Sequence, residues 1–190
     1  MLRTLLAGAL LVSVIHPPAP GAQRPGSTVN SDAVTIEAFK QRVDEYVALH
    51  RKLEASIPAL PKQASPEQVD AHERALAKLI QSARASAKPG DIFEPAMQQL
   101  VRRLLAPVFT GRSGAQIKSE IADNEYKGSV KLVVNGRYPD DVPVSTMPPQ
   151  VLTSLPKLPE KLEYRFVLTN LILFDPHAHI IPDFVEQAFK

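Results

Sequence analysis

The chain has 190 residues, a formal net charge of +2 and no cysteine. Its length is sufficient for one ordinary domain with a hydrophobic core. Its nearly neutral balance, with basic residues spread among acidic ones, gives no electrostatic support for binding nucleic acid or an anionic membrane. The absence of cysteine excludes a disulfide framework, a thiolate metal site, a cysteine nucleophile and a lipid-modified N-terminal cysteine.

Residues 1–22 have the pattern of a secretory signal peptide. Arg3 gives a short basic start, residues 5–15 form an apolar run, and residues 16–22 are rich in proline and small residues. The apolar run is too short to cross a hydrocarbon core of roughly 30 Å, so a permanent anchor is not expected. No later apolar run approaches the length of a membrane span. We therefore expect a periplasmic or secreted protein, cleaved within residues 19–22 or directly after them.

The N-terminal half after the signal is predicted to be helical. Residues 23–32, rich in Gly, Ser, Pro and Asn, read as a disordered leader. A stripe with alternating spacings of three and four then predicts a long helix that ends at Pro58. The stripe consists of Ile36, Phe39, Val43, Tyr46, His50, Leu53 and Ile57. Ser65, with Gln68 as its capping-box partner, starts a second helix, so the two helices are expected to form an antiparallel hairpin.

A third and a fourth helix complete the helical region, residues 33–125. The third is expected to begin at Asp91 and to end at Gly111. It is the most apolar of the four, and its main face is predicted to carry Phe93, Met97, Leu100, Leu104 and Val108. The fourth is short, from Ser113 to about Glu125, and buries Ile117 and Ile121.

Residues 126–190 are predicted to hold proline-rich loops and a small antiparallel sheet. Val130 to Val134 is β-branched and is followed by Asn135-Gly136, a hairpin-type turn signal. Residues 139–160 contain six prolines and are expected to be an extended loop, with one helical turn after Pro148 and Pro149. Residues 163–168 and 171–175 form a predicted hairpin about Thr169-Asn170.

The sequence therefore predicts an α+β fold. Its helical N-terminal half consists of an antiparallel helical hairpin, a third apolar helix and a short fourth. A small antiparallel C-terminal β-sheet packs on these helices, and we expect residues 33–190 to form one domain.

The segment Asp175-Pro-His-Ala-His179 resembles the metal-binding first strand of amidohydrolases, but the context does not support that function. Such enzymes are barrels of about 250 residues, whose further ligands come from later strands. The alternation of apolar and polar residues over 174–184 predicts instead a half-buried strand, at an edge or broken by its prolines. Its solvated face would carry Asp175, His177, His179 and Asp183.

His50 and His72 are a second pair of candidates, because each replaces an apolar residue in a helical stripe. In an antiparallel hairpin both would lie about 10 Å from the connecting turn and could meet. Glu54, four residues after His50, could add a carboxylate. The pair would then serve as a metal site or a protonation switch. The alternative is two hydrogen-bonded or partly wet rings at the edge of the helix–helix contact.

Two sets of short segments in this chain resemble known groups of bacterial proteins. Residues 162–167, 171–175 and 180–183 have the pattern Leu-Glu-Tyr-Arg-Phe-Val, Leu-Ile-Leu-Phe-Asp and Ile-Ile-Pro-Asp. This pattern resembles the C-terminal strand module of periplasmic nickel/cobalt-homeostasis proteins, without the glycine usual at their turn. The segments Lys-Pro-Gly-Asp-Ile-Phe at 88–93 and Asn-Gly-Arg-Tyr-Pro at 135–139 are similar to segments of uncharacterised secreted bacterial proteins. This resemblance implies no activity.

The function expected from the sequence is that of an exported, non-enzymatic domain with an interaction or accessory role in the cell envelope. The sequence is compatible with a protein partner but identifies none, and the oligomeric state is left open. No catalytic, cofactor-binding or metal-binding residue is assigned. Two alternatives stay open: a weak transition-metal-binding periplasmic protein that uses His177/His179 or His50/His72, and an enzyme of unknown type. A pocket lined by convergent titratable groups would favour the enzyme.

Overall fold

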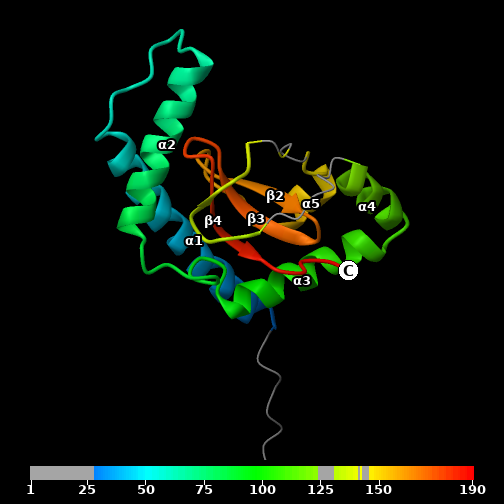
Figure 1. Cartoon of the computed structure of the whole chain (residues 1–190). Coiled ribbons are helices and arrows are strands. Elements are labelled where there is room, and N and C mark those ends of the chain that lie inside the picture. Colours follow the sequence, from blue (N-terminus) through cyan, green and yellow to red (C-terminus); the bar gives the residue numbers. More distant parts are fainter. Residues whose placement is uncertain (1–27, 124–130, 141, 143–145) are drawn as a thin grey trace, which may run out of the picture.

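The computed structural model describes residues 28–123, 131–140, 142 and 146–190, and it confirms the α+β fold (Figure 1). The predicted signal peptide lies outside the described residues. The elements are α1 (Thr28–Glu54), α2 (Pro66–Ala83), α3 (Pro95–Thr110), α4 (Gly114–Asp123), β1 (Gly136–Arg137), α5 (Pro149–Ser154), β2 (Glu163–Val167), β3 (Asn170–Asp175) and β4 (Ile180–Val185). No helix in these ranges is long and apolar enough to cross a membrane.

The first helix begins earlier than the sequence suggested. The predicted disordered leader spans residues 23–32, but α1 already begins at Thr28, so the second half of that leader is helical. Within it, the Ser31 carbonyl accepts a hydrogen bond from the Thr35 hydroxyl, and Asp32 forms an ion pair with Arg103 of α3. These contacts tie the start of α1 to its own next turn and to a neighbouring helix. Residues 23–27 lie outside the described part.

The start of α2 confirms the predicted capping box. The Gln68 backbone N–H donates to the Ser65 hydroxyl at 3.3 Å, and the Ser65 N–H donates to the Gln68 side chain at 2.8 Å. Pro66 occupies the first helical position, where a missing N–H costs nothing. The helix therefore starts where the sequence places it, and α1 and α2 form the expected hairpin (Figure 1).

The third helix begins at Pro95 and not at Asp91. The residue before a proline is driven out of the helical region, and Glu94 accordingly has φ −50° and ψ 156°. The centre of the buried face also lies elsewhere than predicted, because Leu104 and Val108 are only partly buried. The fully buried residues of α3 are Met97, Leu100, Val101, Leu105 and Phe109.

The sheet is antiparallel with the order β1-β4-β3-β2. The hairpin of β2 and β3 is confirmed, although its loop is Leu168-Thr169, one residue earlier than expected. The strand predicted at Val130 to Val134 is wrong over its described residues 131–134, which form a loop and the start of a turn. Asn135-Gly136 does make a turn, and the chain then pairs with β4 through β1.

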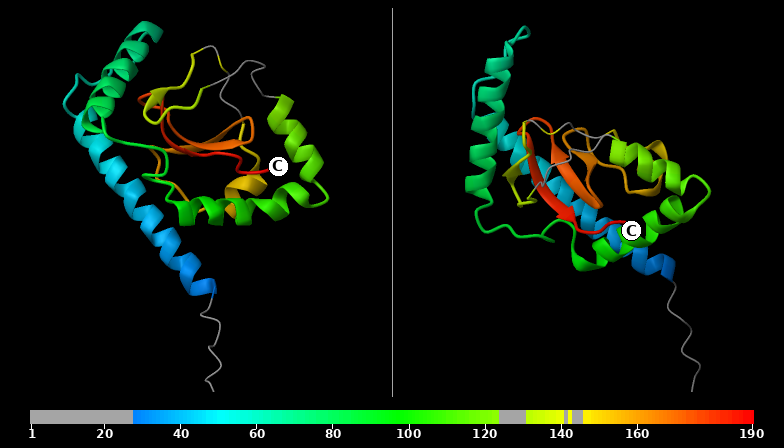
Figure 2. Two further views of the ribbon diagram at one scale, coloured as in Figure 1. Left: turned by 60° about the horizontal axis from the view of Figure 1, so that its bottom comes forward. Right: turned by 45° about the vertical axis from the view of Figure 1, so that its right-hand side comes forward.

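Both faces of the sheet are covered by other parts of the domain. The half-buried strand that the alternation over 174–184 predicts therefore has no solvated face. Leu171, Leu173 and Val185 pack on the helices, whereas Ile172 and Phe184 pack under the loop that contains Tyr138 and Val142. Figure 2 shows α1 and α3 on one side of the sheet and the loop of residues 131–140 on the other. Between these layers, all six residues of β4 are buried.

The chain from 174 to 184 is also not one strand. Residues 176–179 form a turn between β3 and β4, and the register of this pair shifts by one residue between Leu173 and Asp175. The shift exchanges the two faces of β4, so that Ile180 packs on the helices although Phe184 packs on the opposite layer. Asp175 shares the face of Leu171 and Leu173 in β3, and Asp183 lies opposite Leu173, so both aspartates, predicted on a solvated face, are completely buried against the helical side.

Asp183 accepts four hydrogen bonds from backbone N–H groups. Gly90, Ile92 and Phe93 donate to it at 2.8–3.0 Å, as does its neighbour Phe184. A buried carboxylate needs such donors to offset its lost hydration. The arrangement fixes the loop before α3 against β4, so Asp183 has a structural role in joining the helices to the sheet.

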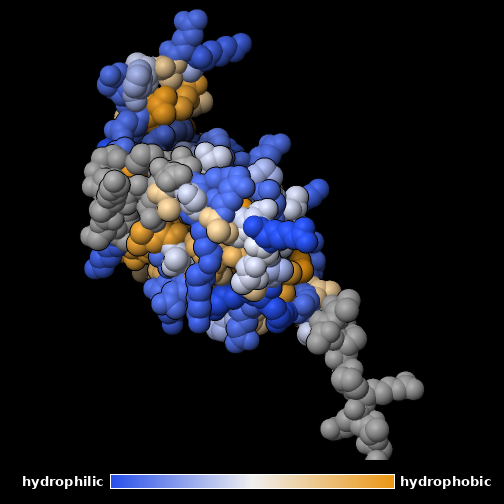
Figure 3. All heavy atoms as spheres, turned by 90° about the vertical axis from the view of Figure 1, so that its right-hand side faces the viewer, coloured by the Kyte–Doolittle hydropathy of each residue, from blue (hydrophilic) through white to orange (hydrophobic). Residues whose placement is uncertain are grey.

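Seen from the side of α4, the surface is mainly hydrophilic (Figure 3). Hydrophobic atoms are exposed in separate patches, one of which lies on the projecting part at the top. Figure 1 shows that the connection from α1 to α2 forms this projecting end of the molecule.

Candidate metal centre

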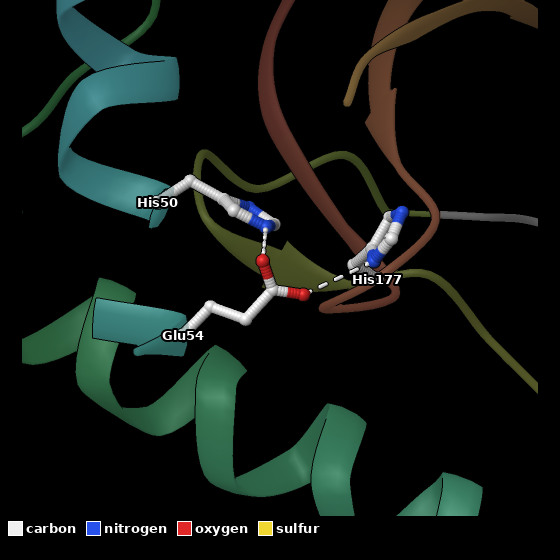
Figure 4. Close-up of side chains that lie close together, drawn as sticks. All are labelled: His50, Glu54 and His177. Carbon is white, nitrogen blue, oxygen red and sulfur yellow. Dashed lines mark hydrogen bonds and ion pairs between the residues drawn. The ribbon is translucent and has the colours of Figure 1, made fainter. Parts of the chain in front are cut away.

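Three potential metal ligands meet where the last turns of α1 face the turn between β3 and β4. His50 and Glu54 are four residues apart, so they lie on one face of α1. His177 comes from the 176–179 turn and points toward them (Figure 4). One ligand atom from each of the three residues lies within 4.8 Å of the other two, the only such group among the described residues.

The carboxylate of Glu54 lies between the two imidazoles. Its Oε2 is 3.3 Å from His50 Nε2, and its Oε1 is 3.2 Å from His177 Nδ1 (Figure 4). Ligand atoms bound tetrahedrally at about 2.0–2.2 Å from Zn²⁺ lie roughly 3.3–3.5 Å apart. Both separations are close to this spacing, each through a different oxygen of Glu54, so small side-chain movements would bring the three residues around one cation.

Asp175, at the end of β3, fixes the ring of His50 from behind. Its Oδ2 accepts a hydrogen bond from the Tyr46 hydroxyl at 2.6 Å and lies 2.7 Å from His50 Nδ1. Its Oδ1 accepts from the backbone N–H groups of His177 and Ala178 at 3.0 and 3.1 Å. A carboxylate accepts hydrogen bonds, so Asp175 favours the tautomer of His50 with its proton on Nδ1, the tautomer that a metal bound at Nε2 requires. The same aspartate thus orients one ligand and the turn that holds the other.

The second nitrogen of His50 is left available for a ligand. His50 is completely buried, and its Nε2 makes no hydrogen bond with any described residue. A carboxylate–imidazole pair with the other nitrogen directed at a metal is the usual arrangement around metal-bound histidine. His50 fits that arrangement, because Asp175 holds its Nδ1 and its buried Nε2 is directed at Glu54.

Lys161 is the competing cation at the site. Its Nζ lies 2.8 Å from Glu54 Oε2 and 3.4 Å from His177 Nδ1. Burial acts to raise the pKa of Glu54, but the hydrogen bond and charge of Lys161, together with His50 and His177, hold this pKa below its ordinary value. Glu54 is therefore ionised at neutral pH, as a metal ligand must be.

A cleft of about 680 Å³ opens beside the cluster. Glu54 and His177 form part of its wall, so two of the three ligands are reached from the cleft. The rest of the lining consists of Arg51, Ala55, Ile57, Ala59, Leu60, Val69, His72, Glu73 and Pro176. A bound ion would be accessible from solution on this side.

The structure combines the two predicted histidine pairs differently. His50 and His177, one from each pair, come together with Glu54, whereas His72 lines the cleft and does not join the cluster. His179 points elsewhere: its Nδ1 is 3.9 Å from Glu73 and its Nε2 is 3.7 Å from Asp140. The turn at 176–179, with φ +53° at His179, is the reason that His177 and His179 do not share a face.

His179 belongs to a separate network of charges between α2 and β1. Arg137 pairs there with Asp70, Glu73 and Asp140. Burial lowers the pKa of His179, and Arg137 adds to this effect against the opposing influence of the three carboxylates. The network is rich in mutually paired charges, and we assign it a structural role.

Sequence reasoning missed the residues that organise the cluster. In the sequence Tyr46 is one member of an apolar stripe, and the alternation predicts Asp175 on a solvated face. Lys161 directly follows the proline-rich segment 139–160, and no local pattern marks it. The i,i+4 spacing of His50 and Glu54 was visible, but the contribution of His177 depends on contacts more than 120 positions apart.

Comparison with known proteins identifies no relative: no protein-family model, no curated protein and no solved structure matches the chain.

Proposed function

We propose that this protein binds one divalent transition-metal ion, such as Zn²⁺, Ni²⁺ or Cu²⁺, through His50, Glu54 and His177. The observation that carries the proposal is the geometry of the buried His50: Asp175 holds its ring at Nδ1, and its Nε2 lies 3.3 Å from the Glu54 carboxylate. Two imidazoles and one carboxylate suit these metals and are a poor set for Mg²⁺ or Ca²⁺, which prefer oxygen ligands.

Binding requires Lys161 to give up its contact with Glu54. The lysine side chain is about one-fifth exposed, so its ammonium group can move into solvent when an ion replaces it. Metal and lysine are therefore alternative partners of one carboxylate. Replacing Lys161 by methionine keeps the apolar stem, removes the competitor, and should increase the affinity for zinc.

The experiment is isothermal titration calorimetry of Zn²⁺ into tag-free protein at neutral pH. We expect one ion per chain, and loss of binding in His50→Ala, His177→Ala and the milder Glu54→Gln. His72→Ala and His179→Ala are matched controls and should bind zinc as the unaltered chain does. No binding by the unaltered chain, or loss of binding only in the controls, would refute the proposal. Circular dichroism establishes that each variant is folded.

Export to the periplasm or the medium is a separate part of the proposal, and residues 1–22 alone support it. The basic start, apolar run and helix-breaking small residues are typical of a cleaved signal. Mass spectrometry of the native protein should find an N-terminus near residues 20–23. A native chain that still starts at Met1 would contradict export. A role as an accessory protein of the envelope rests on this localisation.

A further inference from the structure

The cleft beside the cluster has two chemically different parts. One end is polar and charged, with Glu54 and His177 of the cluster and Arg51 of the same helix. The other wall is apolar, formed by Ile57 and Leu60 after α1, Val69 of α2, and smaller residues between them. Leu60 is 40% exposed, so its side chain is accessible to a ligand in the cleft.

An ion held by three protein ligands keeps a coordination position for a further ligand. Tetrahedral zinc sites with three protein ligands leave the fourth position to water or to a substrate. Because Glu54 and His177 line the cleft whereas His50 is fully buried, the open position of a bound ion faces the cleft. A ligand in the cleft could therefore coordinate the metal directly.

The charges around this position favour an anionic group. With a divalent ion in place, the ion and Arg51 are positive, whereas Glu54 and Glu73 are negative. The positive charges of the cleft lining then exceed the negative ones by one, because the ion has displaced Lys161. Among the described residues Arg51 has no ion-pair partner, so its guanidinium is available to a carboxylate.

We propose that the metal-loaded protein binds a small organic carboxylate with an apolar body. The carboxylate would coordinate the ion and pair with Arg51, and the apolar body would cover Ile57, Leu60 and Val69. The cleft volume of about 680 Å³ lies within the range of small-molecule sites. This inference rests on the proposed metal binding, since without the ion the carboxylate would face Glu54.

The probe is hexanoate, titrated calorimetrically into zinc-loaded and zinc-free protein. We expect binding to the zinc-loaded form only, at least roughly tenfold tighter than binding of acetate, because the additional methylene groups are buried against the apolar wall. Hexylamine, with the opposite charge on the same chain, should not bind. Equal binding of hexanoate with and without zinc, or equal binding of hexylamine, would overturn the inference.

Two variants separate this inference from the metal site itself. Arg51→Gln and Leu60→Ser should weaken hexanoate binding several-fold and leave zinc affinity unchanged. Lys52→Gln is the control for charge, because Lys52 is exposed on α1 and does not line the cleft. Normal zinc binding without hexanoate binding refutes only the carboxylate site. Absence of zinc binding refutes both proposals.

Discussion

Replacing Asp175 by asparagine tests how the fold prepares the cluster. The substitution keeps the size and shape of the side chain and removes its charge. The amide oxygen can still accept from the backbone N–H groups of His177 and Ala178, which now bond to Oδ1. The amide nitrogen then takes the place of Oδ2, which faces Tyr46 and His50.

The new amide group changes the tautomer of His50. Because the amide nitrogen donates hydrogen bonds, His50 Nδ1 must become an acceptor, and the ring proton moves to Nε2. A protonated Nε2 cannot bind a metal. We therefore expect Asp175→Asn to lower zinc affinity by about 10–100-fold or more, the usual effect of removing a residue that orients a metal ligand.

The cost to stability follows from the same hydrogen bonds. Four bonds to a charged acceptor, each contributing about 1.5–3 kcal/mol, become neutral bonds that contribute about 0.5–1.5 kcal/mol each. The free energy of unfolding should fall by about 4–6 kcal/mol, a large part of the stability of an ordinary domain.

Urea unfolding followed by circular dichroism measures the stability, and calorimetry with Zn²⁺ measures the affinity. Asp183→Asn is the matched control, because Asp183 is equally buried in the neighbouring strand and bonds only to backbone N–H groups. Its amide nitrogen would oppose two of these donors, so we expect a larger loss of stability with unchanged zinc affinity. Equal zinc affinity of Asp175→Asn and the unaltered chain would refute the positioning role of Asp175.

Three further predictions concern the fold. Leu105 is fully buried, so Leu105→Ala should lower the free energy of unfolding in urea by about 2–5 kcal/mol. Leu104 is only partly buried, so Leu104→Ala should lower it clearly less. The opposite order would refute the assigned face of α3. Leu168 has φ +56° at the first position of a two-residue hairpin loop, so Leu168→Gly should raise the melting temperature and stabilise by about 1 kcal/mol. Since the pKa of His179 is lowered in the folded state, the unfolded chain takes up the proton first and stability should fall as pH drops below about 6.5. His179→Gln should reduce this fall, measured as unfolding free energy against pH, and an unchanged fall in this variant would contradict the prediction.

The helices and one hairpin were predictable because their signals are local. The stripe from Ile36 to Ile57, the capping box at Ser65 and the apolar runs on either side of Leu168 each depend on neighbours within a few residues. The misplaced start of α3 is a partial exception. Asp91 is a residue type that often precedes a helix, and the sequence therefore predicts a helix start there. Pro95 instead keeps Glu94 out of the helical conformation, and the backbone N–H groups before α3 donate hydrogen bonds to Asp183.

The site was less predictable because it depends on long-range packing. Alternation over 174–184 assumes one strand with one solvated face, whereas the chain turns at 176–179 and both faces of the sheet are covered, so Asp175 lies buried against α1. Tyr46 and Asp175 are 129 positions apart, and no local pattern connects them. The residue types of the cluster were therefore recognisable as candidates, but their pairing was not.

The most direct test of the central claim is X-ray absorption at the zinc edge on the protein loaded with one equivalent of Zn²⁺. Binding by His50, Glu54 and His177 predicts two imidazole nitrogens at about 2.0–2.1 Å, with oxygen completing the shell at about 2.0–2.2 Å. His177→Ala should lose one imidazole contribution, and His179→Ala should lose none. A spectrum with oxygen ligands alone, or one that changes with His179 and not with His177, would contradict the account.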